Sequence, residues 1–150
     1  DQSAKVIINH VTDGVRIAEK ALLPKAVVDF IRTHHGLGKA KYFYNSFKNQ
    51  YPDKEIDEKT FTYPGPNPFS KETAVLMMAD SVEAASRSLK EHTEESIRQL
   101  VDKIIDGQIA DGLLKSAPLT FRDVETIKSV FVDKLKTMFH TRISYPDLKK

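Results

Sequence analysis

The stretch that decides the fold is AVVDFIRTHHG, residues 26–36. Its apolar residues recur at helical spacing. His34 and His35 lie three and four residues after Ile31, so both imidazoles are expected on or beside the helix face that packs on the core. Gly36 is the residue type that commonly ends a helix. Because neutral imidazole is the commonest metal ligand in proteins, the pair predicts half of a metal site.

Outward from this stretch, the same apolar periodicity predicts about six helices and no strand. Capping residues mark several of their starts, with Ser3, Ser70, Thr93 and the Thr120 to Asp123 segment as candidates. Residues 51–69 contain alternating prolines and predict an extended loop, either functional or a linker. The chain is therefore predicted as one all-α helical bundle over residues 1–150, with helices near 3–22, 24–35, 41–48, 71–89, 93–111 and 120–140.

The composition is that of an ordinary globular chain of 150 residues, about one domain in length. Apolar residues make up 40% of it, and the 23 basic residues are scattered, which argues against DNA or RNA as a partner. The absence of cysteine excludes disulfides and thiolate metal sites. No apolar run approaches the ~20 residues of a membrane span, so we expect no direct membrane insertion.

Two further residues are candidates for the same site. His10 falls in the middle of the apolar face of helix 3–22, where a histidine by itself is more often a hydrogen-bonded core residue. Asp80 follows the run 74–79, which is apolar all round and predicts the most buried helix. A buried carboxylate needs a partner, which could be a metal, an arginine or a cap hydroxyl. Arg87, seven residues further on, is about 10 Å away along the axis, so a bound anion is an alternative partner for it.

Other catalytic patterns are missing from the sequence. It contains no glycine-rich phosphate loop, no nucleophile elbow and no H-E-x-x-H. Helical bundles commonly build metal sites from side chains on facing helices. We therefore expect His10, His34, His35 and Asp80 to form a site of nitrogen and oxygen ligands suited to Fe, Mn or Zn.

An aromatic cluster, KYFYNSFK, occupies residues 41–48. The spacing of Tyr44 and Phe47, three residues apart, favours simple packing on one helix face. The alternative is a stacking wall for a base or ring, with the hydroxyl groups of Tyr42 and Tyr44 as polar contacts.

Four stretches carry a resemblance to a known family: HHG (34–36), YFY (42–44), YPGP (63–66) and ADSVEAASRSL (79–89). They resemble HD-domain metal-dependent phosphohydrolases, and most closely the membrane-anchored, seven-transmembrane type that hydrolyses cyclic di-AMP. The resemblance implies an all-α HD-domain fold and a role in bacterial signalling. It also implies a parent protein at the cytoplasmic face of the cell membrane and a two-ion centre that opens the cyclic dinucleotide to a linear one.

The resemblance also implies roles for individual residues. Three imidazoles, those of His10, His34 and His35, would ligate one divalent ion, and Asp80 would ligate the other. Fe or Mn is expected, with Zn as a further possibility. Apart from what the resemblance implies, our own inference is that Tyr42, Tyr44 and Arg87 contact the base and phosphate groups.

The sequence departs from the family pattern because it contains no His-Asp dipeptide. We expect that pair to lie upstream of Asp1, which would make this chain a partial, truncated HD domain cut from a longer protein. Such a fragment is expected to be soluble, to hold at most one ion and to be catalytically inactive or nearly so. It is also expected to self-associate through the apolar face that the missing helices would cover.

Two other functions stay open from the sequence. One is an HD hydrolase that acts on a different nucleotide. The other is a non-catalytic helical module that senses a nucleotide without cleaving it.

Overall fold

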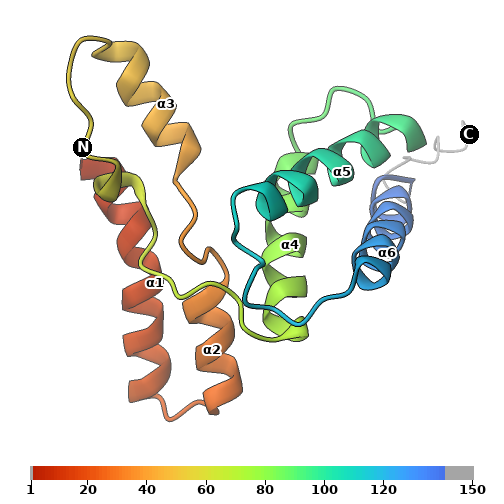
Figure 1. Ribbon diagram of the computed structural model, residues 1–150, viewed down its shortest axis with the longest axis horizontal. Helices are drawn as coiled ribbons and strands as arrows, with labels where there is room; N and C mark the ends of the chain where they lie inside the picture. The colour runs from red at the N-terminus through yellow and green to blue at the C-terminus, as the bar shows by residue number, and fades with distance from the viewer. Residues whose placement is uncertain (1, 141–150) are drawn as a thin grey trace, which may run out of the picture. The chain divides into compact units, whose positions relative to one another are not determined.

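The computed structural model describes residues 2–140, and in this range the chain forms α-helices, one short 3-10 helix and no strand (Figure 1). A single antiparallel bridge joins Lys39 and Thr62. The prediction of an all-α fold with about six helices is therefore confirmed. The elements are α1 (Gln2–Lys20), α2 (Lys25–Thr33), α3 (Lys41–Gln50), η1 (Glu58–Phe61), α4 (Lys71–Ser86), α5 (Glu94–Ala110) and α6 (Phe121–His140).

Reciprocal hydrogen bonds start the last three helices where the sequence places their caps. In each case a hydroxyl accepts a backbone N–H three residues on, and the side chain there accepts the N–H of the capping residue. The pairs are Ser70 with Thr73 for α4, Thr93 with Ser96 for α5, and Thr120 with Asp123 for α6.

Some boundaries differ from the prediction. Ser3 lies within α1 and is not its N-cap. Pro24 occupies the N-cap of α2, with extended backbone angles, and not the first helical position. The helix α4 ends at Ser86, three residues before its predicted end at Leu89, in a turn closed by hydrogen bonds from the N–H groups of residues 88 and 89.

The chain divides into two compact units. Of the described residues, the first unit comprises 2–77 together with 109–118, and the second comprises 78–108 together with 119–140. The prediction of one domain over residues 1–150 stays a prediction. Buried side chains of the first unit include Ala4, Val11, Ala18, Val28, Phe61, Tyr63 and Met77, and those of the second include Val82, Ile97, Val101, Ile105, Val132 and Leu135.

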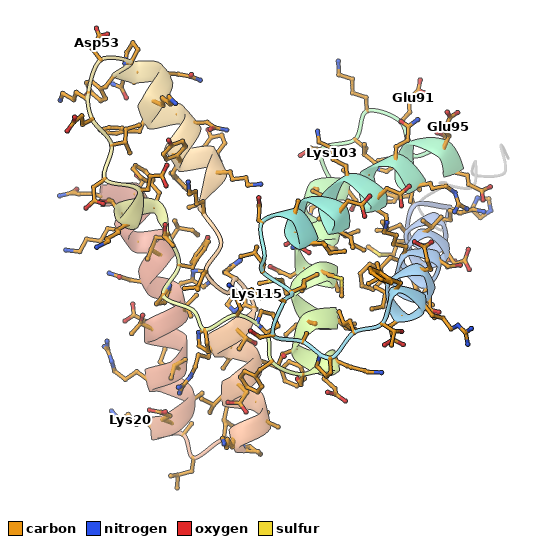
Figure 2. All side chains as sticks on the ribbon, in the orientation of Figure 1. Lys20, Asp53, Glu91, Glu95, Lys103 and Lys115 are labelled. Atoms are coloured by element: carbon orange, nitrogen blue, oxygen red, sulfur yellow. The ribbon has the colours of Figure 1, made fainter. Side chains whose placement is uncertain are left out.

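Within the first unit, α1 and α2 form an antiparallel pair (Figure 1). A Cβ at Gly14 would lie 3.0 Å from Cγ2 of Ile31, so this glycine permits the close approach of the two helices. The charged side chains of Lys20 and Asp53 point outward at opposite ends of this unit (Figure 2). No helix within residues 2–140 has both the length and the apolar character that a membrane span needs.

Candidate metal centre

Three of the four predicted ligands converge. The side chain of His10 on α1 meets those of His34 and His35, in the turn that follows α2. One ring nitrogen from each of the three lies within 4.8 Å of the others, and all three side chains are half-buried. Among the described residues 2–140, this is the one group of three or more such side chains with ligand atoms so close together.

Two of the imidazoles are oriented by their own helices. Nδ1 of His10 donates a hydrogen bond to the carbonyl of Ile7, and Nδ1 of His34 donates to the carbonyl of Ile31 at 2.6 Å. A carbonyl oxygen can only accept, so in each ring we assign the hydrogen to Nδ1. In its neutral form, each ring with this tautomer carries its lone pair on Nε2.

These two lone pairs face one another. The Nε2 atoms of His10 and His34 are 3.1 Å apart. Two lone pairs at this distance repel unless a proton or a cation lies between them. Metal–imidazole bonds of about 2.0–2.1 Å place two ligands of one ion about 3 Å apart, so the donor set fits a transition metal ion.

His35 completes the cluster with a ring that is neutral at pH 7. Burial, followed by the charges of His34 and His10, lowers the pKa of His35 from 6.5 to about 4. Its ring stacks on that of Tyr63, with the centroids 4.2 Å apart and the planes at 16°. The centroid of His35 is also 5.0 Å from that of His10.

The turn that carries the histidine pair is held by hydrogen bonds of its own. Thr33 is fully buried, and its hydroxyl donates to the carbonyl of Asp29 at 2.8 Å. The N–H of Gly36 donates to the carbonyl of Thr33, and the N–H of Gly38 donates to that of His35. The helix α2 ends at Thr33, two residues before its predicted end, with His34 as its C-cap, and Gly36 adopts the left-handed conformation, with a φ of +51°, within the turn that follows.

Sequence reasoning assigned no role to Tyr63, which the structure places against the histidines. Its side chain is buried, and its ring centroid is 4.2 Å from that of His35 and 6.0 Å from that of His10. Tyr63 belongs to the loop predicted from its prolines. No periodic pattern in that loop could indicate which helix it covers.

The prediction that Asp80 is buried is wrong, because its side chain is exposed on α4, in the second unit. The apolar run before it is not buried all round. Met77 and Met78 are buried, whereas Leu76 is 39% exposed, and Asp80 follows Leu76 by one helical turn on the exposed face. The place of Asp80 in a metal centre stays a prediction.

The predicted substrate contacts have local partners. Arg87 is exposed, and its guanidinium forms two hydrogen bonds with the carboxylate of Glu83, so its partner within α4 and the following turn is a carboxylate. Tyr42 is 76% exposed, with its ring edge-on to that of Phe43.

Tyr44 and Phe47 both pack on the same aromatic ring. Each has its ring centroid 5.7 Å from that of Phe61. This arrangement agrees with the packing interpretation of that face of α3. Contact of Tyr44 with a base stays a prediction.

Comparison with known proteins finds relatives of this chain among the cyclic-di-AMP phosphodiesterases. No family model matches the chain. The chain is 41% identical over 148 residues to the cyclic-di-AMP phosphodiesterase PgpH of Bacillus subtilis, and 36% identical over 149 residues to that of Listeria monocytogenes. Each alignment covers 99% of this chain and 20% of the relative, so the chain spans about a fifth of the length of these curated relatives.

Solved structures of the same relative have the same fold. The crystal structure of the L. monocytogenes phosphodiesterase PgpH HD domain in complex with cyclic di-AMP matches with a TM-score of 0.87 and 35% identity, over 96% of this chain and 67% of that chain. A second crystal structure of the L. monocytogenes phosphodiesterase PgpH HD domain matches with a TM-score of 0.84 and 32% identity, over 93% of this chain and 64% of that one.

Proposed function

Because this chain belongs to the PgpH family of HD domains, we propose that it supplies the histidine ligands of a metal centre that serves the hydrolysis of cyclic di-AMP to a linear dinucleotide. The observation that carries the proposal is the pair of Nε2 atoms of His10 and His34, 3.1 Å apart, with both Nδ1 atoms engaged by backbone carbonyls. The third ligand is His35.

The donor set suits a divalent transition metal, with Fe or Mn first and Zn as a further candidate. When bound, such an ion acts as a Lewis acid on a phosphoryl oxygen and makes a nucleophile available from water near neutral pH. The three imidazoles hold the ion without carrying charge themselves. In the complete family site, Asp80 is the proposed ligand of a second ion, on the strength of its place in the stretch ADSVEAASRSL.

The substrate contacts are proposed from exposure and chemistry. The exposed ring of Tyr42 offers a face on which an adenine can stack, and Tyr44 lies two residues further along the same segment. Arg87 can exchange its carboxylate partner, Glu83, for a phosphate, since both are oxyanions that accept paired N–H donors.

Hydrolysis by the chain alone is proposed to be weak. The sequence contains no His-Asp dipeptide, the pair that the family resemblance expects for the bridging position. We therefore propose that the 150-residue chain holds at most one ion. The location of the parent protein at the cytoplasmic face of the membrane, and self-association through exposed apolar residues such as Val6 and Ile17, also stay proposals.

The metal site is tested with the variant His34→Asn. The asparagine amide can still donate to the carbonyl of Ile31, but it has no atom at the position of Nε2. Titration with Co²⁺, followed by visible absorption, is expected to show affinity at least about a hundredfold lower than for the unmodified chain, because even partners outside the coordination shell contribute about 10–100-fold. The control is His140→Asn, at the end of α6, which should bind as the unmodified chain does. Equal affinity of the two variants would contradict the site.

The substrate is tested by calorimetry and by a hydrolysis assay. The metal-loaded chain should bind cyclic di-AMP more tightly than cyclic di-GMP, and chelation of the metal should weaken that binding. The L. monocytogenes HD domain is the positive control for turnover. A rate similar to that of the control would contradict the one-ion proposal, and equal affinity for both cyclic dinucleotides would contradict the substrate.

A further inference from the structure

The loop from Phe61 to Pro68 lies directly on the turn that carries the two adjacent histidines. Two backbone hydrogen bonds join the loop to residues 38–40, which follow that turn: the N–H of Ala40 donates to the carbonyl of Phe61 at 2.8 Å, and the N–H of Tyr63 donates to that of Gly38 at 2.9 Å. These bonds flank the bridge between residues 39 and 62. The loop is therefore held in one register against the segment that follows the histidines.

Further along, the side chain of Asn67 contacts the turn itself. Its Oδ1 accepts the backbone N–H of Leu37 at 2.9 Å. Leu37 is two residues after His35, and its N–H is the last in the turn 34–37. This contact depends on Gly36, because a Cβ at that residue would lie 2.6 Å from Oδ1 of Asn67.

A second glycine, on the loop side, allows the same close approach. A Cβ at Gly65 would lie 2.7 Å from Cδ2 of Leu37, and Gly65 has a φ of +72°. Each of the two segments therefore lacks a side chain where the other comes closest. The two glycines therefore allow the backbones of the loop and the turn to approach more closely than any other residue type would.

In addition to this backbone hydrogen bond, Tyr63 contacts the ring of His35 with its side chain. It is buried in a core cluster with Val11 and Ala40, so its own ring has little freedom. The imidazole of His35 lies flat against it, with the planes at 16°. Rotation of His35 about χ2 would break this stack, so the direction of its ligand nitrogen is coupled to the position of Tyr63.

We propose that Asn67 and Tyr63 are positioning residues of the metal centre: Asn67 holds the backbone of the histidine turn, and Tyr63 sets the plane of the His35 ring. This inference rests on the proposed function, since it assumes that the three histidines bind an ion. Groups that orient metal ligands without touching the metal typically contribute about 10–100-fold in affinity. Neither residue needs to touch metal or substrate.

The inference is tested first at Asn67. Asn67→Ala removes the acceptor of the Leu37 N–H and is expected to weaken Co²⁺ binding about tenfold or more and to alter the visible spectrum of the bound ion. The melting temperature of the metal-free chain should change little, even though the Co²⁺ affinity falls. Asn67→Asp keeps an oxygen acceptor and should restore both affinity and spectrum. The matched control is Asn45→Ala, on an exposed face of α3.

Tyr63 provides a second, independent comparison that holds even where the Asn67→Ala chain fails to fold. Tyr63→Phe keeps the ring against His35 and should bind Co²⁺ within about threefold of the unmodified chain. Tyr63→Leu keeps apolar bulk but removes the flat face, and should bind about tenfold more weakly or worse.

The outcomes separate the two proposals. If the unmodified chain binds no Co²⁺, the proposed metal centre is refuted and this inference falls with it. If the unmodified chain binds and Asn67→Ala and Tyr63→Leu bind equally well, the inference alone is overturned. A loss of affinity that Asn45→Ala shares, or that Asn67→Asp does not restore, would also overturn it.

Discussion

At Gly36 the backbone angle and the space around the residue impose the same requirement. Its φ is +51°, and a Cβ would lie 2.6 Å from Asn67 and 2.8 Å from the terminal methyl of Met77. For a residue with a side chain, the left-handed backbone conformation is less favourable by about 1–2 kcal/mol. The short distances to Asn67 and Met77 would in addition force these neighbours to move. A residue next to the histidine pair is thus restricted to glycine for two independent reasons.

We predict that Gly36→Ala lowers the free energy of unfolding by about 2 kcal/mol or more, from left-handed strain together with displacement of Asn67. Chemical denaturation of the metal-free chain measures this change. Gly107→Ala is the matched control, because Gly107 lies inside α5 and a Cβ there would have no neighbour within 4 Å. The control should raise stability by about 0.5–1 kcal/mol. A Gly36→Ala chain as stable as the unmodified one would contradict the strain assigned to this turn.

At the scale of elements, the ends of helices are decided by a few polar side chains. In α6, the hydroxyl of Thr120 accepts the N–H of Asp123 at 3.0 Å, and the carboxylate of Asp123 accepts the N–H of Thr120 at 2.9 Å. The first turn of a helix has N–H groups with no partner inside the helix, and this pair satisfies one of them while tying down the residue before it. The carboxylate also lies near the positive end of the helix dipole.

We predict that Thr120→Ala lowers the free energy of unfolding by about 1 kcal/mol, because alanine cannot accept the N–H of Asp123. Thr126→Ala is the control, since Thr126 is exposed within α6 and alanine has the higher helix propensity. Thermal unfolding followed by circular dichroism compares the two. The capping assignment is contradicted if both substitutions shift the midpoint in the same direction by similar amounts.

At the scale of the whole molecule, the candidate site belongs to one of the two units. All three histidines, the turn 34–37 and the loop from Phe61 to Pro68 lie in the first unit, whereas α6 lies in the second. A ligand that binds only the folded state stabilises it by mass action, by about 2.7 kcal/mol when its free concentration is about a hundred times Kd. A metal ion at the histidines should therefore act first on the unit that contains them.

We predict that metal loading slows amide hydrogen exchange in α1, in residues 34–38 and in the loop 61–68, and that a chelator reverses the effect. Exchange in the amides of α6 should change less, because none of the proposed histidine ligands lies there. Mass spectrometry of peptic fragments measures both regions in one experiment, with the His34→Asn chain as the control that should show no metal effect. Protection confined to α6 would contradict the location of the site.

How far the sequence could predict this protein depends on the range of each interaction. Helix starts follow from contacts three residues apart, and so Ser70, Thr93 and Thr120 could be identified as caps from their neighbours in the chain. Ser3 was predicted wrongly, since a serine near a helix start is equally suited to its first turn. The inward placement of His10 and His34 also followed from periodicity.

Burial was harder to predict, because it depends on partners that are distant in the chain. The run before Asp80 has no polar residue, yet one face of α4 is exposed and Asp80 lies on it. Apolar residues on every face of a helix indicate that each face can be buried, but they do not indicate which faces have another segment packed against them. The contact of Tyr63 with His35 could not be inferred at all, since Tyr63 lies 28 residues beyond His35 in a loop with no periodicity.

The sequence by itself determined that the chain is helical, where most of its helices begin, and that it carries imidazole side chains on inward helix faces. Those properties depend on neighbours within about one helical turn, which the sequence contains directly. Only the tertiary structure decided that His10 meets the His34 and His35 pair, and that Tyr63 and Asn67 lie against that turn. These contacts join segments that are more than 20 residues apart in the chain. They depend on close packing at Gly14, Gly36 and Gly65, where a side chain would collide with a neighbouring segment. The sequence does not state which segments those neighbours are, because they are distant in the chain.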